Sequence, residues 1–295
     1  MNALVVGASG QLGADLVAVL AARGFKVVGT HCSRGAAGTI ALDIRDRQAA
    51  ARSIAETAAD VVFLAHNTPG GVDYCEEHPE EAMALLTQGT RNMLDAAAPR
   101  RARVVFFSSD YVFDGQAGPY DEQARPCPVS AYGRAKLAAE RLVEAYPHGR
   151  LIIRTTAVFS WAPGTKNFAM QVWENLRAGK AFRVPDDQWC NPTLADFLAE
   201  AAVSLVQGGH DGVFNVVGRD WLPRSELGLA LARAMSLDAS LIRPVPTSEL
   251  RQRARRPLKG GLKTDKLREA LGSEPPGLAQ ALERFSLKFR QTAHT

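Results

Sequence analysis

Near its N-terminus the chain carries Val5-Val6-Gly7-Ala8-Ser9-Gly10-Gln11-Leu12-Gly13, an apolar run that leads directly into a glycine loop. The run predicts a buried strand, and residues 12–23 repeat apolar side chains at a helical spacing. A loop between a strand and a helix presents backbone N–H groups and the helix N-terminus to an anion. Gly7 permits the tight turn, Gly10 lets the backbone approach a pyrophosphate, and Gly13 lets the helix pack on the strand. The stretch therefore predicts a dinucleotide site.

The rest of the first half alternates short apolar runs with longer helical patterns. Runs at 3–6, 25–28, 61–65, 104–107 and 151–153 predict strands. Such alternation is typical of an α/β fold, a doubly wound parallel sheet of Rossmann type with helices on both faces. After residue 156 the pattern loosens and Pro and Gly become frequent. We expect a dinucleotide-binding Rossmann domain at 1–156 and a smaller mixed α/β substrate lobe at 157–295, interleaved with the last strands of the first.

The end of the second predicted strand indicates the type of dinucleotide. NAD-specific sites usually carry an acidic residue there, whereas this chain has His31-Cys32-Ser33-Arg34. Arg34 would reach a 2′-phosphate, so we predict NADPH, with NADH left open. The other residues predicted to bind the cofactor are Gly7, Ser9, Gly10, Gln11, Leu12 and Gly13 in the loop, Asp43 and Ile44 at the adenine edge, and Ala65 and His66 after the fourth strand. A simple polar loop residue is the alternative for His66.

Tyr132 and Lys136 stand four positions apart and would share one face of a helix. A free tyrosine has a pKa near 10, and a nearby ammonium and an oxidised nicotinamide would lower it. Tyr132 could then protonate a carbonyl oxygen, while Lys136 also holds the nicotinamide ribose. Ser109 precedes Tyr132 by 132 − 109 = 23 positions, at the end of the strand at 104–107. Because parallel sheets bind ligands at that end, we predict Ser109, Tyr132 and Lys136 as the catalytic set.

The segment around these three residues resembles the dTDP-4-dehydrorhamnose reductase family of extended short-chain dehydrogenases. The shared stretches are Ser108 to Gly115, Pro119-Tyr120, Tyr132-Gly133, Lys136-Leu137, Gly89 to Asn92, Arg154-Thr155, Asn167-Phe168, Asp187-Gln188, Pro192-Thr193 and Arg256-Pro257. The resemblance implies NAD(P)H-dependent reduction of the 4-keto group of a nucleotide-linked deoxysugar. It also implies that Ser109, Asn167 and Gln188 contact the substrate.

Several positions depart from that family pattern. Ala157 stands where the family has tryptophan, and Leu64-Ala65-His66-Asn67 replaces its Asn-Ala-Ala-Ala. Leu86 replaces an expected asparagine. The catalytic set is intact while the substrate pocket differs. Two alternatives therefore stay open: a non-catalytic NADP-binding regulatory subunit like the methionine adenosyltransferase β-subunit, or a ketoreductase of a non-nucleotide natural-product intermediate.

Composition sets the remaining expectations. The net charge is +4, and the one dense basic cluster, residues 251–256, is interpreted as a solvated surface and not as a nucleic-acid site. No apolar run is long enough to span a membrane, and no signal peptide opens the chain. Neither the four cysteines nor the six histidines show metal-ligand spacing, so we expect no metal. We expect a cytoplasmic protein with reduced thiols and leave open a homodimer.

Overall fold

A computed structural model describes residues 1–33 and 35–292. At its centre lies a seven-stranded sheet in the order β11-β6-β5-β4-β1-β2-β3, whose strands pair in parallel. The strands are β1 (Asn2–Val6), β2 (Lys26–His31), β3 (Thr39–Ala41), β4 (Val61–Leu64), β5 (Arg103–Ser109), β6 (Arg150–Thr155) and β11 (Gly212–Asn215). The predicted Rossmann-type sheet is confirmed, and its order reverses between β1 and β4.

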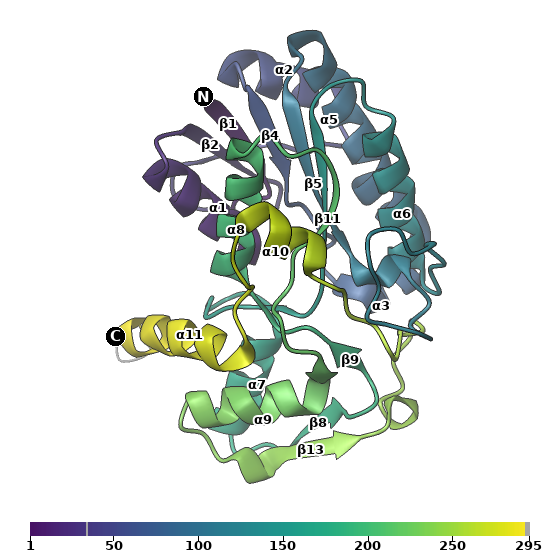
Figure 1. Cartoon of the computed structure of the whole chain (residues 1–295), viewed down its shortest axis with the longest axis vertical. Coiled ribbons are helices and arrows are strands. Elements are labelled where there is room, and N and C mark those ends of the chain that lie inside the picture. Colours follow the sequence, from purple (N-terminus) through teal and green to yellow (C-terminus); the bar gives the residue numbers. More distant parts are fainter. Residues whose placement is uncertain (34, 293–295) are drawn as a thin grey trace.

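The strands of the sheet bury both faces because alternate side chains point to opposite sides. Ala3, Val5 and Phe63 pack under helices α1 (Gln11–Ala22) and α8 (Ala195–Gln207), within one apolar cluster. Leu4 and Val6 belong to a second cluster under α2 (Arg47–Thr57), α5 (Gly89–Ala97) and α6 (Ala131–Glu144). Helices therefore cover both faces, as Figure 1 shows.

Part of the second half of the chain lies below the main sheet in Figure 1, where α7, α9, α11, β8, β9 and β13 are drawn, whereas α8 and α10 lie beside the sheet. The small sheets of the second half pair β10 with β7 and β13 with β8 in parallel, and β12 with β9 in antiparallel. The strands are β7 (Val158–Phe159), β8 (Phe182–Pro185), β9 (Trp189–Cys190), β10 (Thr193–Leu194), β12 (Leu222–Pro223) and β13 (Ile242–Val245), and the helices are α7 (Phe168–Arg177), α9 (Arg224–Ala234), α10 (Asp265–Leu271) and α11 (Leu278–Thr292). The division at residue 156 stays a prediction, and β11 returns from the second half to the edge of the main sheet.

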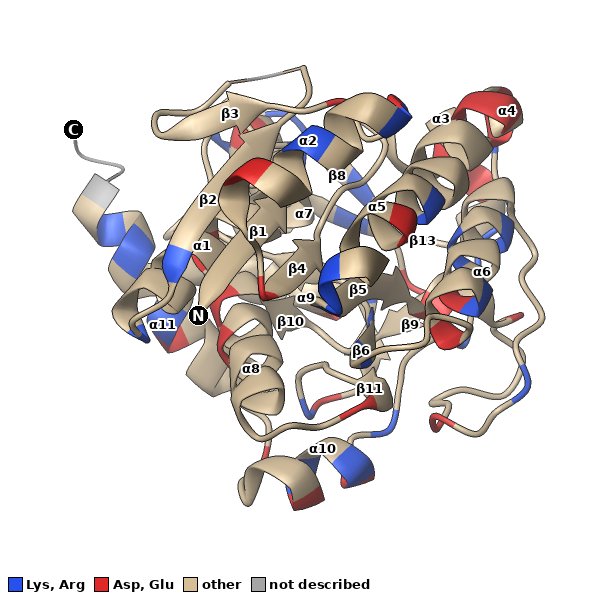
Figure 2. Cartoon of the chain, turned by 90° about the horizontal axis from the view of Figure 1, so that it is seen from above, with Lys and Arg blue, Asp and Glu red and all other residues tan. Residues whose placement is uncertain are grey.

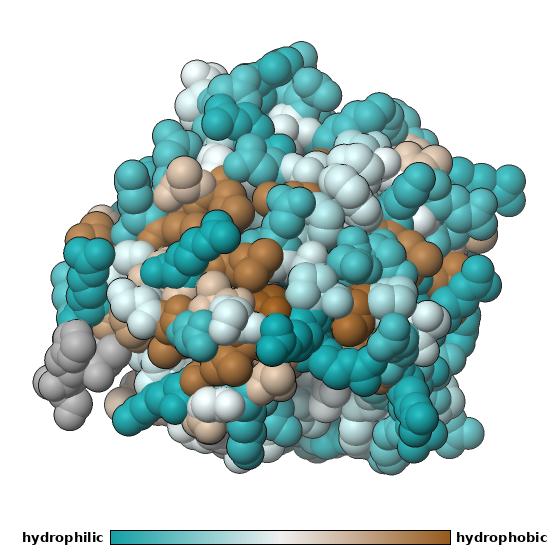
Figure 3. Space-filling view, turned by 90° about the horizontal axis from the view of Figure 1, so that it is seen from below, coloured by the Kyte–Doolittle hydropathy of each residue, from teal (hydrophilic) through white to brown (hydrophobic). Residues whose placement is uncertain are grey.

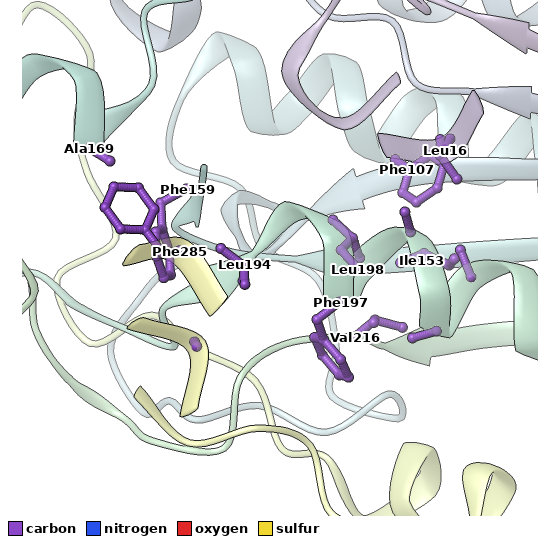
Figure 4. Packing of buried hydrophobic residues seen from close by; sticks show 14 of the residues in the cluster. Leu16, Phe107, Ile153, Phe159, Ala169, Leu194, Phe197, Leu198, Val216 and Phe285 are labelled. Carbon is purple, nitrogen blue, oxygen red and sulfur yellow. The ribbon is translucent and has the colours of Figure 1, made fainter. Parts of the chain in front are cut away.

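One apolar core joins the two halves. The cluster that contains Leu16 and Phe107 on the sheet continues through Leu194 to Phe285 of α11. Figure 4 shows this succession, from Leu16, Phe107 and Ile153 on one side to Phe159 and Phe285 on the other. Because packing is continuous, the segments after β6 are fixed relative to the sheet that carries the glycine loop.

Charged residues are found mainly on the helices and loops, while the central strands carry few of them (Figure 2). The face seen from below carries apolar patches among hydrophilic residues (Figure 3). Within the described part of the chain, no helix is both long and apolar enough to cross a membrane. All four cysteines, Cys32, Cys75, Cys127 and Cys190, are free thiols.

Candidate cofactor and catalytic site

The glycine loop has the shape that a bound dinucleotide requires. Gly7 has a φ of +85°, and Gly10 begins α1 without a side-chain cap. A Cβ on Gly13 would lie 2.1 Å from the carbonyl oxygen of Gly7, so only glycine fits there. Helix α1 begins just after β1, next to the point where the sheet order reverses, which is where open α/β sheets bind nucleotides, and its first N–H groups have no side-chain cap. The loop thus fits the pyrophosphate of a dinucleotide.

Among the other predicted cofactor residues, Asp43 and Ile44 have partners outside the glycine loop, whereas Ala65 borders it. The Asp43 carboxylate accepts hydrogen bonds from Arg45, the shortest at 2.6 Å, and this pairing lowers the pKa of Asp43. Ile44 is buried, and its carbonyl accepts a 2.8 Å hydrogen bond from Asn92 Nδ2. A Cβ on Gly7 would lie 3.1 Å from Ala65 O, which places the end of β4 against the loop. Arg34 lies outside the described residues, and so does its predicted contact with a 2′-phosphate.

His66 is buried behind the site. Its Nε2 lies 3.4 Å from Thr90 Oγ1, and its Nδ1 has no hydrogen-bond partner among the described residues. Burial, together with the charge of Lys136, lowers the pKa of His66 from 6.5 to about 3. The imidazole is therefore neutral at physiological pH, and its Nδ1 is a buried polar atom without a partner among the described residues.

Ser109 ends β5 and begins a short 3₁₀ turn, Asp110–Val112. Its hydroxyl accepts from Tyr111 N at 3.3 Å and donates to Asp110 Oδ1 at 3.2 Å. Asp110 is itself buried, and its Oδ2 accepts a 3.1 Å hydrogen bond from Gly261 N. Burial raises the pKa of the Asp110 carboxyl. Asp110 thus ties the serine loop to the C-terminal segment, a role that the sequence analysis did not assign.

Tyr132 lies in the first turn of α6, whose N-cap Ser130 accepts from Gly133 N at 3.2 Å. A Cβ on Gly133 would lie 2.1 Å from Tyr111 O, so α6 begins in close contact with the serine turn. The ring of Tyr111 meets the ring of Tyr132 edge-on with centroids 5.6 Å apart. Burial raises the pKa of the Tyr132 hydroxyl well above its usual value.

Lys136 is buried one turn further along α6. Its Nζ donates to Phe107 O at 2.9 Å and lies 5.8 Å from the centroid of the Tyr132 ring. Burial lowers the pKa of Lys136 from 10.5 to about 8. The structure thus places Ser109, Tyr132 and Lys136 at the junction of β5 and α6, with the lysine anchored on the backbone of β5.

The two predicted substrate residues have local partners. Asn167 caps α7: its Oδ1 accepts from Ala169 N at 3.0 Å and its Nδ2 donates to Thr165 Oγ1 at 2.8 Å. Gln188 Nε2 donates to Thr247 Oγ1 and to Gln252 Oε1, each at 2.9 Å. Asn167 therefore uses its polar atoms within its own loop, whereas Gln188 lies against the segment that lines a cavity.

That cavity has a volume of about 580 Å³ and is lined in part by Asp114, Gln116, Thr247, Arg251, Arg255 and Arg256. The interpretation of residues 251–256 as a solvated surface is wrong for Arg256, whose side chain is 8% exposed. Arg256 pairs with Asp73 at 2.8 Å, while its Nη1 has no partner among the described residues. The pairing joins residues far apart in sequence, so the local charge pattern could not reveal it. The described residues hold no group of three or more metal-ligating side chains.

This fold is that of the short-chain dehydrogenase/reductase class. The chain belongs to the RmlD substrate binding domain family, which it matches over residues 1–291. It is 33% identical over 273 residues to a dTDP-4-keto-6-deoxy-D-glucose reductase of Streptomyces niveus, covering 90% of both chains. It is 30% identical over 297 residues to a probable low-salt glycan biosynthesis reductase of Haloferax volcanii, covering 98% of both. The crystal structure of a dTDP-4-dehydrorhamnose reductase from Clostridium acetobutylicum superposes with a TM-score of 0.88 at 26% identity, covering 99% of this chain and 100% of that one.

Proposed function

We propose that the protein is an NADPH-dependent oxidoreductase that reduces the 4-keto group of a nucleotide-linked deoxysugar. The observation that carries this proposal is the meeting of Ser109, Tyr132 and Lys136 at the carboxyl end of a parallel sheet whose glycine loop fits a dinucleotide. Family membership and the reductases among its relatives support the reaction type. NADH stays an alternative cofactor.

The three side chains would divide the chemistry. NADPH, when bound, supplies the hydride that reduces the carbonyl carbon. The Ser109 hydroxyl binds the carbonyl oxygen and orients it toward Tyr132, whose hydroxyl gives up its proton to that oxygen. The ammonium of Lys136 stabilises the negative charge that forms on Tyr132 and holds the nicotinamide ribose. Gly7 to Gly13 hold the pyrophosphate.

The anionic part of a nucleotide sugar would occupy the cavity lined in part by Asp114 and Thr247. Its arginines Arg251, Arg255 and Arg256 offer planar donors that match phosphate oxygens. The unsatisfied Nη1 of Arg256 and the contact of Gln188 with Thr247 support a polar ligand at this place. The sugar would then extend from the cavity toward Ser109.

Turnover tests the proposal directly. Purified protein should oxidise NADPH when it is given dTDP-4-keto-6-deoxy-D-glucose, and the loss of absorbance at about 340 nm monitors this oxidation. The Tyr132→Phe variant should lower kcat about 100-fold or more. Equilibrium binding of NADPH is measured on the same samples. Bound cofactor without turnover across a panel of dTDP-, UDP- and GDP-linked keto sugars would contradict the proposal.

Two alternatives follow from the altered pocket. The departures at Ala157 and at Leu64 to Asn67 also suit a non-catalytic NADP-binding regulatory subunit, which would copurify with a catalytic partner and show no reductase activity. They equally suit a ketoreductase of a non-nucleotide intermediate. A ligand that binds only the folded state raises the melting temperature. If the substrate is not a nucleotide sugar, dTDP, UDP and GDP should not bind and should leave the melting temperature unchanged.

We also propose that the enzyme is cytoplasmic and that it assembles as a homodimer. The four free thiols support a reducing compartment. Sedimentation equilibrium on the purified protein gives its mass, and a value equal to the monomer at micromolar concentration would contradict the homodimer.

A further inference from the structure

Asp110 is a buried carboxyl group in direct contact with Ser109. The residue is 3% exposed. Its Oδ1 lies 3.2 Å from Ser109 Oγ, and its Oδ2 accepts a hydrogen bond from Gly261 N at 3.1 Å. Each carboxyl oxygen therefore has one partner, and the partner of Oδ1 is the hydroxyl that the proposed reaction uses.

The segment around Gly261 fixes which carboxyl oxygen accepts from the backbone. A Cβ on Gly260 would lie 2.8 Å from Asp110 Oδ2, and Gly260 O accepts a 2.9 Å hydrogen bond from Trp221 Nε1. Gly261 O accepts from Tyr120 N at 2.9 Å, so the segment is held from two sides. Because a backbone N–H can only donate, Oδ2 is an acceptor in either protonation state of Asp110. A proton on the carboxyl would then be carried by Oδ1, which faces Ser109.

The Ser109 hydroxyl has a single proton to donate. Tyr111 N donates to Ser109 Oγ at 3.3 Å, which uses one of the two acceptor positions of that oxygen. If Asp110 is ionised, both of its oxygens can only accept, and the Ser109 proton is used on Oδ1. If Asp110 is neutral, Oδ1 donates to Ser109 Oγ, and the Ser109 proton is free for a carbonyl oxygen of the substrate. The ionisation of Asp110 thus decides whether Ser109 can donate to the substrate.

The surroundings of Asp110 favour its neutral form. Burial raises the pKa of the Asp110 carboxyl, while its hydrogen bonds and the charge of Arg224 on α9 act in the opposite direction. Arg224 forms no ion pair with Asp110 in the described part of the chain. The other titratable groups that interact with Asp110 are Tyr111, Tyr132 on α6 and Cys190 on β9, and none of them can carry a positive charge. Because desolvating an unpaired carboxylate is costly, a carboxyl in such a place takes up a proton instead.

We propose that Asp110 is a positioning residue that acts through Ser109: as a neutral acid it donates from Oδ1 to Ser109 Oγ and leaves the Ser109 proton for the carbonyl oxygen of the substrate. Asp110 loses no proton during the reaction, since the proton that reaches the substrate comes from Tyr132. The hydrogen bond between Asp110 and Ser109 then runs in the opposite direction to that of an ionised Asp110. The role in turnover rests on the proposed reductase function, whereas the ionisation of Asp110 does not.

The ionisation of Asp110 is tested without turnover. In protein whose aspartates carry ¹³C at the carboxyl carbon, the resonance that is missing from Asp110→Asn belongs to Asp110. With NADPH present at pH 7, this resonance should have the chemical shift of a neutral carboxyl. Asp238, assigned through Asp238→Asn, is the matched control, because it is exposed and its hydrogen bonds with Ser240 lower its pKa, so it should have the shift of a carboxylate. A carboxylate shift for Asp110 at pH 7 overturns the proposal.

The positioning role is tested with NADPH and dTDP-4-keto-6-deoxy-D-glucose. Asp110→Ala should lower kcat about 10- to 100-fold, because the Ser109 hydroxyl loses the partner that orients it. Asp110→Asn should restore kcat to within about threefold of wild type, since Gly261 N requires the amide oxygen as its acceptor and Nδ2 then donates to Ser109 Oγ. In a Ser109→Ala background, Asp110→Ala should lower kcat by less than about threefold, as expected for a residue that acts through Ser109.

Three results separate the outcomes. An Asp110→Asn enzyme that is as slow as Asp110→Ala overturns the proposal, because the charged carboxylate would then be required. An equal effect of Asp110→Ala with and without the Ser109 hydroxyl overturns it as well, because the loss would then come from another contact. Asp110→Asn has the shape of the native residue and still decides if Asp110→Ala does not fold. A wild type that turns over no keto sugar contradicts the proposed function alone, and the Asp110 resonance still decides on the neutral carboxyl.

Discussion

Glu140 on α6 and Arg154 on β6 form a bidentate ion pair inside the protein. Arg154 Nε donates to Glu140 Oε1 at 3.0 Å and Arg154 Nη2 to Oε2 at 2.7 Å, with the side chains 3% and 0% exposed. Arg154 Nη1 also donates to Glu122 O at 3.3 Å. Because Lys136 lies one turn before Glu140 on the same helix, this pair fixes the helix that carries the proposed proton donor.

Removing one partner should destabilise the fold strongly. We expect Glu140→Gln to lower the free energy of unfolding by about 3–5 kcal/mol, because Arg154 then keeps an uncompensated charge in the interior. Guanidinium denaturation measures the change. Asp265→Asn, which breaks the exposed pair with Arg268, should cost less than about 0.5 kcal/mol. A double change of Glu140→Leu and Arg154→Met should recover much of the loss, and a Glu140→Gln protein as stable as wild type would contradict the role of the pair.

The buried ammonium of Lys136 should lower the free energy of unfolding, although the proposed reaction requires this residue. Its pKa is about 8 when folded and 10.5 as a free side chain, so the unfolded state binds the proton more tightly between these values. The burial penalty, about 3 kcal/mol, is therefore complete below pH 8 and fades as pH rises toward 10.5. Lys136→Met should be more stable than wild type at pH 7, inactive, and close to wild type by pH 10. Equal pH dependence of the two unfolding free energies would refute this.

His66 should make the protein sensitive to acid. Its pKa is about 3 in the folded state against 6.5 for a free histidine, so stability is lost as pH falls from 6.5 toward 3, where only the unfolded chain is protonated. At pH 5 the loss due to this group is about 2 kcal/mol. His66→Gln should remove that part of the acid destabilisation, measured as the difference in urea midpoint between pH 7 and pH 5. A variant that loses as much stability as wild type over this range would show that His66 is protonated when folded.

Substitutions at two glycines of the loop should have different effects, one mainly on cofactor affinity and the other mainly on stability. Gly10 has an extended backbone, and a Cβ there would meet Gly7 O at 3.2 Å, so Gly10→Ala should fold but bind NADPH about tenfold or more weakly. Gly13→Ala should destabilise the fold by about 3 kcal/mol, because its Cβ would clash with the strand–helix turn. Ala14→Gly, which is exposed, should cost about 1 kcal/mol without changing affinity. Calorimetry of NADPH binding and thermal unfolding would distinguish these three.

Periodicity predicted most of the sheet because each central strand is a continuous apolar run, as at Val61–Leu64. It also placed Ser109, Tyr132 and Lys136, since the serine follows such a strand and the other two share a helical face. The strands β7, β9, β10 and β12 have two residues each and are too short to carry a pattern.

Contacts between distant segments account for what sequence reasoning missed. The burial of Arg256 depends on Asp73, which belongs to α3 (Gly71–Glu77). Asn167 is the N-cap of α7, a position that its residue type prefers, and its assignment to the substrate pocket stays a prediction. The partner of Arg256 is set by tertiary packing, which no local spacing encodes.

The return of β11 to the edge of the main sheet has a consequence for any shortened form of this protein. A fragment that stops at residue 156 would keep the glycine loop and the Ser109–Tyr132–Lys136 set but would leave β6 with a row of unpaired N–H and C=O groups. Open strand edges of this kind recruit further strands, including those of identical molecules. By pairing with β6, strand β11 of the second half covers this edge and prevents self-association through it. This is in addition to any part that the second half has in substrate specificity.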